Sequence, residues 1–353
     1  MIYRLQAADA SLLEALDAAR DQLIARSGIA SPAVRRLRRQ ARTAAFSAST
    51  SIEGFAIPPD AHALANREAT GDLDDADRAA LSCYALAMHH VETLARDPHF
   101  RWLDRVLLDL HFEACSFQRD RAPGLWRVGP VFVTRPGGQS AYRAPSAGSV
   151  PELMAEVVSW LVDGDRDAHP AVRAAMAHLH LVSVHPFRDG NGRLARIVQS
   201  LVLARSGPLP PELGSIEPYL ARHTDDYYAE LIAAQGDSYD PARDASSWIS
   251  FCLSGHLHEA RARLAQLETG TRRWEALEGV VAERSWPDRL VIALEQALFD
   301  SCSRGAYAVE ANVSLATASA DLRRLADAGW LVQVGKGRSV TYRASDALRE
   351  RAT

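Results

Sequence analysis

The sequence is almost without lysine. Lys336 is the only one among 353 residues, and arginine supplies the rest of the 40 basic side chains. No apolar run approaches the roughly 20 residues of a membrane span, and the opening segment MIYR is not that of a signal peptide. A net charge of −4 argues against bulk affinity for nucleic acid. We therefore expect a cytoplasmic protein that does not enter the membrane.

Cysteine is also scarce. The four cysteines are scattered singly, without CxxC or metal-ligand spacing: Cys83, Cys115, Cys252 and Cys302. This excludes a disulfide framework and a structural zinc site, and it predicts reduced core residues.

What the chain has is length and helical periodicity. At 353 residues it can form one large domain and a smaller one. Apolar residues recur at helical spacing, as at Leu81, Tyr84 and Met88, and again from Val172 to Val184. The pattern predicts a mostly α protein, a helical bundle interrupted by a single β-hairpin.

Residues 185–196, HPFRDGNGRLAR, form what we call the signature loop. Gly190 and Gly192 tolerate positive φ, so the N–H groups around Asn191 can converge on an anion, at the start of a helix expected at about Arg193. Arg193 and Arg196 are three residues apart, hence neighbours on one helix face, and both can bind phosphate oxygens. Asp189 is a hard oxygen ligand suited to Mg²⁺, and His185 can take a proton from a hydroxyl.

The loop resembles the signature of the Fic family, H-P-F-x-[D/E]-G-N-G-R-x-x-R, at every fixed position. The resemblance implies transfer of AMP from ATP to a Ser, Thr or Tyr hydroxyl of a target protein, and modification of the chain itself. It implies His185 as general base and Asp189 as the Mg²⁺ ligand. Phosphate binding then falls to Gly190, Asn191, Gly192, Arg193 and Arg196. Phe187 is interpreted as a buried anchor of the loop.

A second motif lies upstream, in residues 49–54, STSIEG. Ser31 and Pro32 predict a helix start and Gly54 a stop, which puts Glu53 against the negative end of the helix dipole, where an acid is disfavoured unless paired. The run resembles the inhibitory motif of the same family, carried here by Ser49, Glu53 and Gly54. That resemblance implies that Glu53 pairs with Arg196 and removes it from the γ-phosphate. A plain solvent-facing glutamate at a helix end is the alternative.

Between the two motifs, Val131, Phe132, Val133 and Thr134 form a β-branched and aromatic run that ends in a Pro-Gly-Gly turn. The family has a β-hairpin flap here, which holds the target segment by strand addition. Downstream, the resemblance implies that Tyr227 and Gln235 border the adenosine, although Gln235 stands where the family often has Asn. For Tyr228, packing in the core and contact with the adenosine are equally good explanations.

Residues 288–353 predict a smaller unit of helices followed by a two-strand hairpin, which resembles a winged helix-turn-helix. Its recognition helix would begin at Ser314, and residues 335–338 would form the wing. Four basic residues predict DNA contacts: Arg323, Arg324, Lys336 and Arg338. Winged helices also mediate dimers, so DNA and a second copy of the chain both stay open as partners.

These features divide the chain into four parts. Residues 1–110 form an N-terminal helical region with an inhibitory helix at about 32–54, and residues 111–265 form the Fic core. A linker over 266–287 leads to the winged helix-turn-helix of 288–353. Two other functions stay open. One is removal of AMP from a modified target by the same residues, and the other is a DNA-binding regulator whose Fic-like part senses nucleotide without turnover.

Overall fold

The computed structural model describes residues 1–353 except 30, 56–73, 135–139, 337–339 and 353. They form two compact units. The first unit comprises Met1–Ala30 and Arg36–Leu264, and the second comprises Ser31–Arg35 and Ala265–Thr353. Helices predominate, with five short strands among the described residues, so the mostly α fold is confirmed. None of the helices in this part of the chain is long and apolar enough to cross a bilayer.

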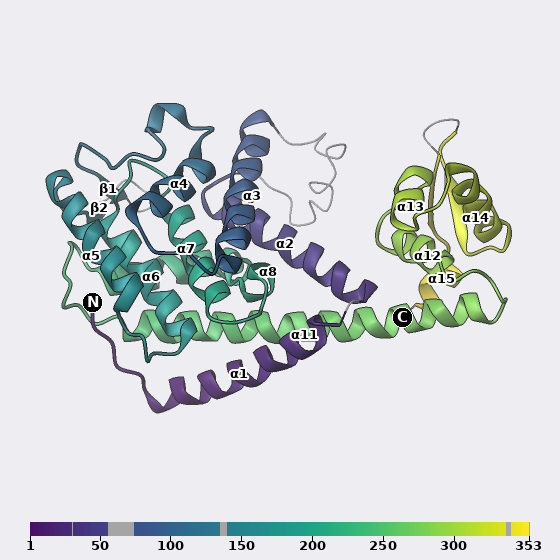
Figure 1. Ribbon diagram of the computed structural model, residues 1–353, viewed down its shortest axis with the longest axis horizontal. Helices are drawn as coiled ribbons and strands as arrows, with labels where there is room; N and C mark the ends of the chain where they lie inside the picture. Colours follow the sequence, from purple (N-terminus) through teal and green to yellow (C-terminus); the bar gives the residue numbers. More distant parts are fainter. Residues whose placement is uncertain (30, 56–73, 135–139, 337–339, 353) are drawn as a thin grey trace. The chain divides into compact units, whose positions relative to one another are not determined.

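The first unit is a helical bundle with one hairpin (Figure 1). Its longer helices are α1 (Ala7–Ser27), α2 (Pro32–Ile52), α3 (Asp75–Arg96), α4 (Asp104–Cys115), α5 (Val150–Asp163), α6 (Pro170–Val184), α7 (Asn191–Arg205), α10 (Thr224–Gln235) and α11 (Ser246–Ala282). The short helices are η2 (Arg119–Arg121), η3 (Ala147–Ser149), α8 (Pro211–Gly214) and α9 (Glu217–Arg222). Strands β1 (Phe132–Thr134) and β2 (Ser140–Arg143) pair antiparallel. Helices α2 and α11 contribute residues to both units.

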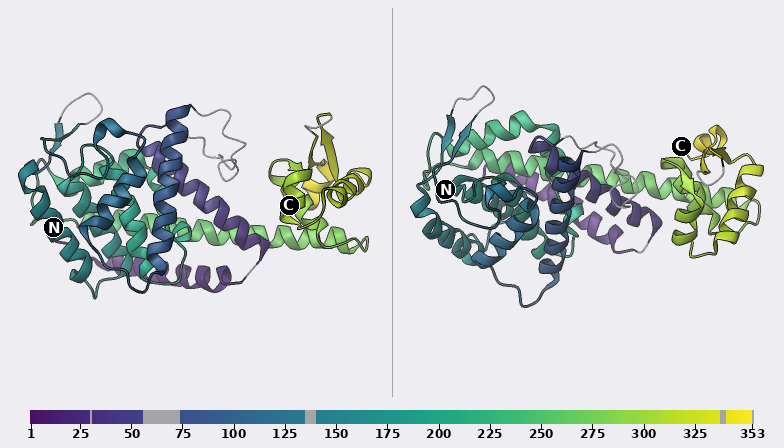
Figure 2. Two further views of the ribbon diagram at one scale, coloured as in Figure 1. Left: turned by 45° about the horizontal axis from the view of Figure 1, so that its top comes forward. Right: turned by 90° about the horizontal axis from the view of Figure 1, so that it is seen from above.

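Helices α6 and α7 form the centre of this unit (Figure 2). Every residue of α7 from Arg193 to Ala204 is buried, and α3, α4 and α6 all pack against it. A helix that is buried all round needs apolar or paired side chains on every face, and this is why α6 and α7 lack the polar stripe of a surface helix. The signature loop joins the end of α6 to the start of α7, so both of its ends are anchored in the buried centre of the bundle.

Helix α2 has the bounds that the sequence predicts. Ser31 Oγ accepts from the N–H of Val34 at 3.2 Å, Pro32 is the first helical residue, and the helix stops at Ile52, just before Gly54. Ion pairs hold its middle. Arg38 Nε lies 2.7 Å from Oε1 of the buried Glu212, and Arg42 Nη2 lies 2.7 Å from Oε1 of Glu92.

The second unit contains a three-stranded antiparallel sheet in the order β3-β5-β4. Its elements are α12 (Leu290–Phe299), β3 (Cys302–Ser303), α13 (Arg304–Glu310), α14 (Leu315–Asp327), β4 (Leu331–Val334), β5 (Thr341–Ala344) and α15 (Asp346–Arg351). Ser314 caps α14, its Oγ accepting from the N–H of Thr317 at 3.1 Å, where the sequence predicts the cap. The buried Asp321 joins the helices, because it accepts from Arg289 Nε at 2.7 Å and from the Tyr307 hydroxyl at 2.9 Å.

Two features of this unit differ from the expectation. The segment 266–287, interpreted above as a linker, is helical in α11 as far as Ala282, and Leu277, Val280 and Val281 belong to the core of the second unit. Strand β3 is not expected from the sequence. It is only two residues long, too short to show an alternating pattern.

Candidate functional site

His185 ends helix α6 in a left-handed conformation, with φ +52°. Its Nδ1 lies 3.2 Å from the carbonyl oxygen of Val182, which can only accept, so Nδ1 carries the proton and Nε2 keeps its lone pair. Burial, opposed by that hydrogen bond and reinforced by Arg127, lowers the pKa of His185 to about 4. The side chain is therefore neutral at pH 7. A neutral imidazole with an open Nε2 is suited to accept a proton.

Phe187 and Asn191 close the loop. Phe187 is fully buried, as expected, and Asn191 both accepts from its N–H and donates to its carbonyl, each at 2.9 Å. The family resemblance implies that Asn191 helps to cradle the phosphates through the backbone of the loop. Its side chain is bonded to Phe187, so its backbone N–H is the group left for an anion.

The start of α7 explains the two glycines. Gly190 has φ +78°, and a Cβ there would lie 2.4 Å from Cys115 Sγ. Gly192 does not use the positive φ that glycine tolerates, because α7 begins at Asn191 and not at about Arg193 as expected. A Cβ on Gly192 would lie 2.8 Å from Glu53 Oε1. One glycine is required by the turn and the other by the close approach of a carboxylate.

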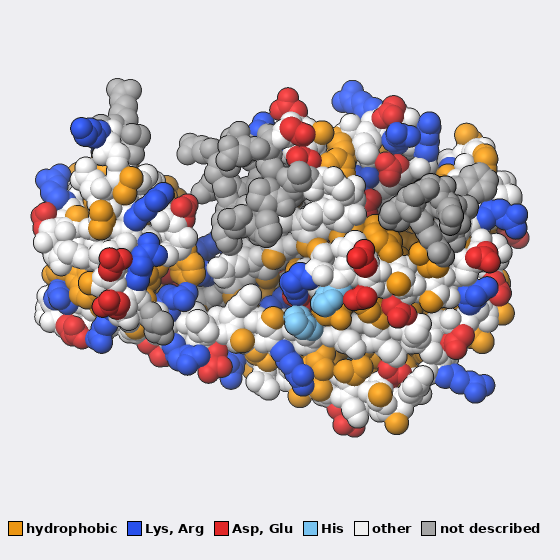
Figure 3. Space-filling view, turned by 180° about the vertical axis from the view of Figure 1, so that it is seen from behind, with side chains coloured by type: hydrophobic (Ala, Val, Ile, Leu, Met, Phe, Trp, Pro, Cys, Tyr) orange, Lys and Arg blue, Asp and Glu red, His pale blue; other side chains and the backbone are white. Residues whose placement is uncertain are grey.

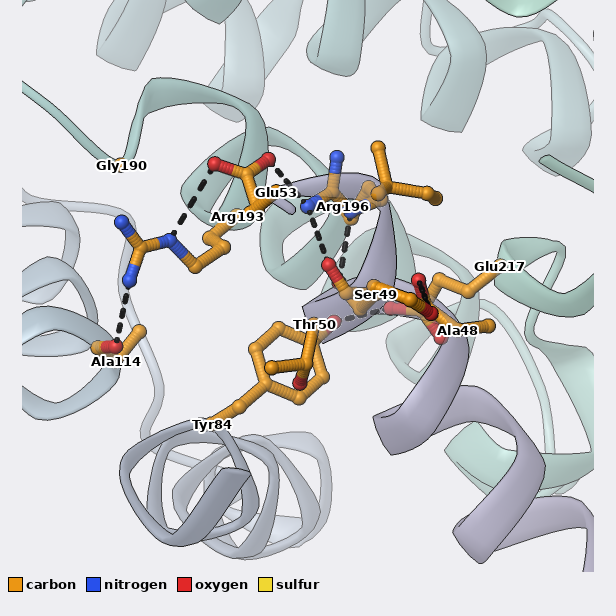
Figure 4. Close-up of polar contacts among 12 residues, drawn as sticks. Ala48, Ser49, Thr50, Glu53, Tyr84, Ala114, Gly190, Arg193, Arg196 and Glu217 are labelled. Carbon is orange, nitrogen blue, oxygen red and sulfur yellow. Dashed lines mark hydrogen bonds and ion pairs between the residues drawn. The ribbon is translucent and has the colours of Figure 1, made fainter. Parts of the chain in front are cut away.

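That carboxylate lies between two arginines (Figure 4). Glu53 Oε1 accepts from Arg196 Nη2 at 2.7 Å, and Oε2 lies 3.5 Å from Arg193 Nε. Burial lowers the pKa of Arg196, but Glu53 and the neighbouring tyrosines raise it further, so the guanidinium stays charged. The start of α7 and the two arginines thus form an anion site, and it holds the chain's own carboxylate.

The two arginines are not equivalent. Arg193 Nη2 donates to Gln118 Oε1 at 2.8 Å, and its guanidinium carbon lies 5.4 Å from the centre of the Phe117 ring. Arg196 Nη1 is buried without a hydrogen-bond partner among the described residues. Arg193 is held by Gln118, just after α4, and Arg196 is held by Ser49 of α2. Each keeps one buried donor without a hydrogen-bond partner among the described residues, Nε in Arg193 and Nη1 in Arg196.

Asp189 lies at the entrance to this site, and 39% of its side chain is exposed. Its Oδ1 accepts from the N–H of Gly190 at 2.7 Å and lies 3.7 Å from Arg193 Nη2. Both contacts use Oδ1, so Oδ2 is left to bind a further partner such as a metal ion. The described residues contain no group of three or more His, Cys, Asp or Glu side chains that could hold a metal by themselves.

The two tyrosines of α10 differ in burial. Tyr227, assigned above to the adenosine, is 1% exposed, and its hydroxyl lies 3.1 Å from His178 Nε2. Tyr228 is 42% exposed, and its hydroxyl donates to the carbonyl of Ile52 at 3.3 Å. Adjacent helical residues point in different directions, so only one of the pair can face the core. Gln235 is also buried and donates to Ser183 Oγ at 3.3 Å.

Two residues outside the motifs hold the loop. His111 Nδ1 accepts from the N–H of Gly124 at 2.9 Å, so its Nε2 donates to the Asp189 carbonyl at 2.8 Å, and its ring stacks on Phe187 with centroids 3.5 Å apart. Arg127 donates from Nε to the His185 carbonyl at 2.7 Å, from Nη1 to Gly129 at 3.0 Å and from Nη2 to Pro145 at 2.6 Å. Arg127 therefore joins the loop to both ends of the β1–β2 hairpin.

The hairpin itself is present, and we call β1–β2 the flap. Val133 pairs with Tyr142, whose hydroxyl donates to the Ser183 carbonyl at 2.6 Å near the end of α6. On the other side of β2, the N–H of Arg143 donates to the Asp237 carbonyl at 3.0 Å. Val131 directly precedes β1, and the expected Pro-Gly-Gly turn lies outside the described residues. Among the described strands β1 pairs only with β2, so its outer edge can accept another strand.

Comparison with known proteins agrees with this geometry. Residues 99–203 match the model of the Fic/DOC family. Over 165 residues the chain is 35% identical to protein adenylyltransferase fic-1 of Caenorhabditis briggsae, covering 46% of this chain and 28% of the relative. The C. elegans protein of the same name is 33% identical over 165 residues, with the same coverage. The chain thus spans less than a third of the length of these curated relatives.

The fold is also found among solved structures. A Fic family protein from Desulfovibrio desulfuricans G20 has a TM-score of 0.62 and 22% identity, covering 98% of both chains. Fic-1 of C. elegans, residues 134–508, has a TM-score of 0.57 and 24% identity, covering 74% of this chain and 72% of that one. At these identities the likeness concerns the fold.

Proposed function

The chain belongs to the Fic/DOC family through residues 99–203, and from this premise we propose that it is an autoinhibited protein adenylyltransferase. It transfers AMP from ATP to a Ser, Thr or Tyr hydroxyl of a target protein, and to itself. One observation carries the proposal. The anion site at the start of α7 is intact, lies beside a neutral histidine, and is filled by Glu53.

The reaction follows from the residues around the loop. The target hydroxyl loses its proton to His185 Nε2 as its oxygen attacks the α-phosphorus of ATP. The P–O bond to the β-phosphate breaks, and pyrophosphate leaves. Arg196, the N–H groups at the start of α7 and, at the edge of the site, Arg193 stabilise the phosphate charge.

Asp189 fits the magnesium ion that ATP brings. Mg²⁺ is usually held by one or two carboxylates together with substrate phosphates, and Asp189 is a half-exposed carboxylate at the entrance of the anion site. The ion would neutralise phosphate oxygens there.

Inhibition follows from the position of Glu53. Its carboxylate occupies the donors that a phosphate would use, and Arg196 cannot pair with both. Release of the end of α2 would free Arg196 Nη2 and the space over Gly192. This competition makes Glu53 the inhibitory residue, with Ser49 holding the same arginine in place.

The test is intact-mass detection of protein-bound AMP after incubation with ATP and Mg²⁺. We expect an adduct on the Glu53→Gly variant, little on the wild type, and none on the Glu53→Gly/His185→Ala variant. An adduct of equal size on all three would refute His185 as base and Glu53 as inhibitor. The absence of adduct from Glu53→Gly would favour AMP removal, for which a purified AMP-modified protein is the substrate to try.

A second function concerns the second unit. Helix α13, helix α14 with its Ser314 cap and the β4–β5 hairpin follow each other as in a winged helix, and Arg323, Arg324 and Lys336 are exposed, while Arg338 lies outside the described residues. On the face in Figure 3, its basic side chains lie among acidic and apolar ones. We propose DNA binding at modest affinity. A gel shift with duplex DNA should weaken on changing Arg323 and Arg324 to Ala, and a shift that persists unchanged argues against it.

A further inference from the structure

A cavity of about 650 Å³ lies at the base of the flap. Its walls come from three segments: the residues that lead into β1, those that leave β2, and Ser238 with Tyr239 after α10. Its size is within the range of about 300–1,000 Å³ typical of ligand pockets. We call it the flap-base pocket.

The pocket is close to the reacting centre. Gly129 lines it, and one guanidinium, that of Arg127, donates both to the Gly129 carbonyl at 3.0 Å and to the His185 carbonyl at 2.7 Å. The Arg127 side chain thus links the pocket wall directly to the backbone of the general base. Val128, another wall residue, is 99% exposed and presents apolar surface at the pocket.

The pocket also lies on a defined face of the flap. Tyr142 faces the end of α6, and Arg143, the next residue of β2, lines the pocket. Successive residues of a strand point to opposite faces. A target strand added to the outer edge of β1 alternates in the same way. If its hydroxyl side chain faces His185, the residues immediately before and after it face the side of Arg143.

Arg143 gives this face its charge. Its side chain is exposed and makes no ion pair or hydrogen bond with another described residue. A planar guanidinium binds a carboxylate through two parallel hydrogen bonds. The aliphatic and aromatic walls, including Val131 and Tyr239, can cover the stem of such a side chain.

We propose that the flap-base pocket receives an acidic side chain of the target segment, adjacent to the modified hydroxyl, with Arg143 as its counter-ion. This rests on the proposed function, because it requires a target segment on the flap. The expected substrates are therefore extended segments with Asp or Glu beside the residue that carries the hydroxyl.

The test uses fluorescent peptides with one central Tyr, differing only in whether its neighbours are Glu, Gln or Lys. Their binding to the full chain is measured by anisotropy without nucleotide. An exposed ion pair contributes up to about 1 kcal/mol, which corresponds to about fivefold in affinity, so we expect the Glu peptide to bind about fivefold tighter than the Lys peptide. Arg143→Glu should reverse this order, and Arg143→Lys should keep it.

Arg105→Glu, a charge reversal at an exposed arginine of α4, is the matched control and should leave the order unchanged. Equal affinities, an order that Arg143→Glu does not reverse, or no binding of any peptide would overturn the proposal. AMP addition to the Glu53→Gly protein itself is measured separately. An adduct without the charge preference rejects the pocket alone, and the charge preference without an adduct rejects only the transfer reaction.

Discussion

Ser49 holds Arg196 through two hydrogen bonds, from Nε to the serine Oγ at 2.7 Å and from Nη2 to its carbonyl oxygen at 3.0 Å. Both residues are buried. Arg196, which the anion site needs, is thus held at two points: by the hydroxyl and carbonyl of Ser49 in α2, and by the carboxylate of Glu53 just after the end of this helix. The inhibitory contact is therefore broader than a single ion pair.

Ser49→Ala should release the inhibition in part. The change removes one acceptor and leaves a buried, charged donor unsatisfied, at a cost of about 1–3 kcal/mol to the docked state of α2. We expect AMP addition between that of wild type and Glu53→Gly. Ser47→Ala is the matched control, because Ser47 is buried on the same helix and its Oγ has no hydrogen-bond partner among the described residues. Equal effects of the two changes would argue against a specific role of Ser49.

Glu53→Gly should destabilise the first unit and make its stability depend on ATP. Removing one partner of a buried ion pair costs about 3–5 kcal/mol, and the low end applies because Glu53 is 16% exposed. ATP should then restore the lost stability, since its phosphates pair with Arg196. Thermal unfolding with and without ATP measures both effects. If ATP raised the midpoint of wild type and variant equally, Glu53 would not compete with nucleotide.

The sequence predicts the parts of the site that lie within short motifs. The bounds of α2, the flap and the loop between α6 and α7 all follow from local signals such as caps, strand patterning and the glycine spacing. The family resemblance adds the pairing of Glu53 with Arg196, which are 143 residues apart and are joined in the structure.

The other contacts between distant segments could not be predicted. Arg127 reaches a carbonyl 58 residues away and His111 one 78 residues away, and backbone carbonyls leave no signature in the sequence. The sequence also leaves open, for a related reason, which of Tyr227 and Tyr228 is buried. Both residues fit the same motif, and only the rotation of α10 in the bundle decides which one is buried.

Acid should destabilise the first unit below about pH 6.5. Burial lowers the pKa of His111 to about 4 and that of His178 to about 3, whereas an unfolded histidine titrates near 6.5. Between these values the unfolded state binds more protons, so stability falls as pH falls. The loss should approach about 2 kcal/mol per such histidine between pH 6.5 and pH 5.

Urea unfolding at several pH values measures this slope. His178→Gln should reduce the slope, and His99→Gln, at an exposed position, should not. If the free energy of unfolding changed with pH equally in wild type and in both variants, groups other than His178 would cause the acid sensitivity. The same reasoning predicts no acid limb from His185 in the pH–rate profile above pH 5, because burial lowers its pKa to about 4.

Arg127→Lys should lower the rate of AMP transfer without weakening ATP binding. Arg127 positions the loop, since its guanidinium joins the carbonyl of His185 to both ends of the flap, and an ammonium group cannot span these acceptors. A misplaced base costs up to about a hundredfold in rate, so in the Glu53→Gly background we expect kcat to fall about tenfold to a hundredfold. The KM for ATP should stay constant, because Arg127 makes no contact with Glu53 or Arg196 among those described.

Arg173→Lys separates positioning from stability. Arg173 also donates to two backbone carbonyls, those of Gly164 at 3.0 Å and Leu161 at 3.1 Å, but at the opposite end of α6 from His185. A purely structural role would make the two lysine variants lose activity in proportion to their loss of thermal stability. If Arg127 positions the loop, Arg127→Lys lowers kcat far more than Arg173→Lys when the two variants are equally stable. ATP should then raise the midpoint of thermal unfolding of Arg127→Lys by as much as it does without this substitution.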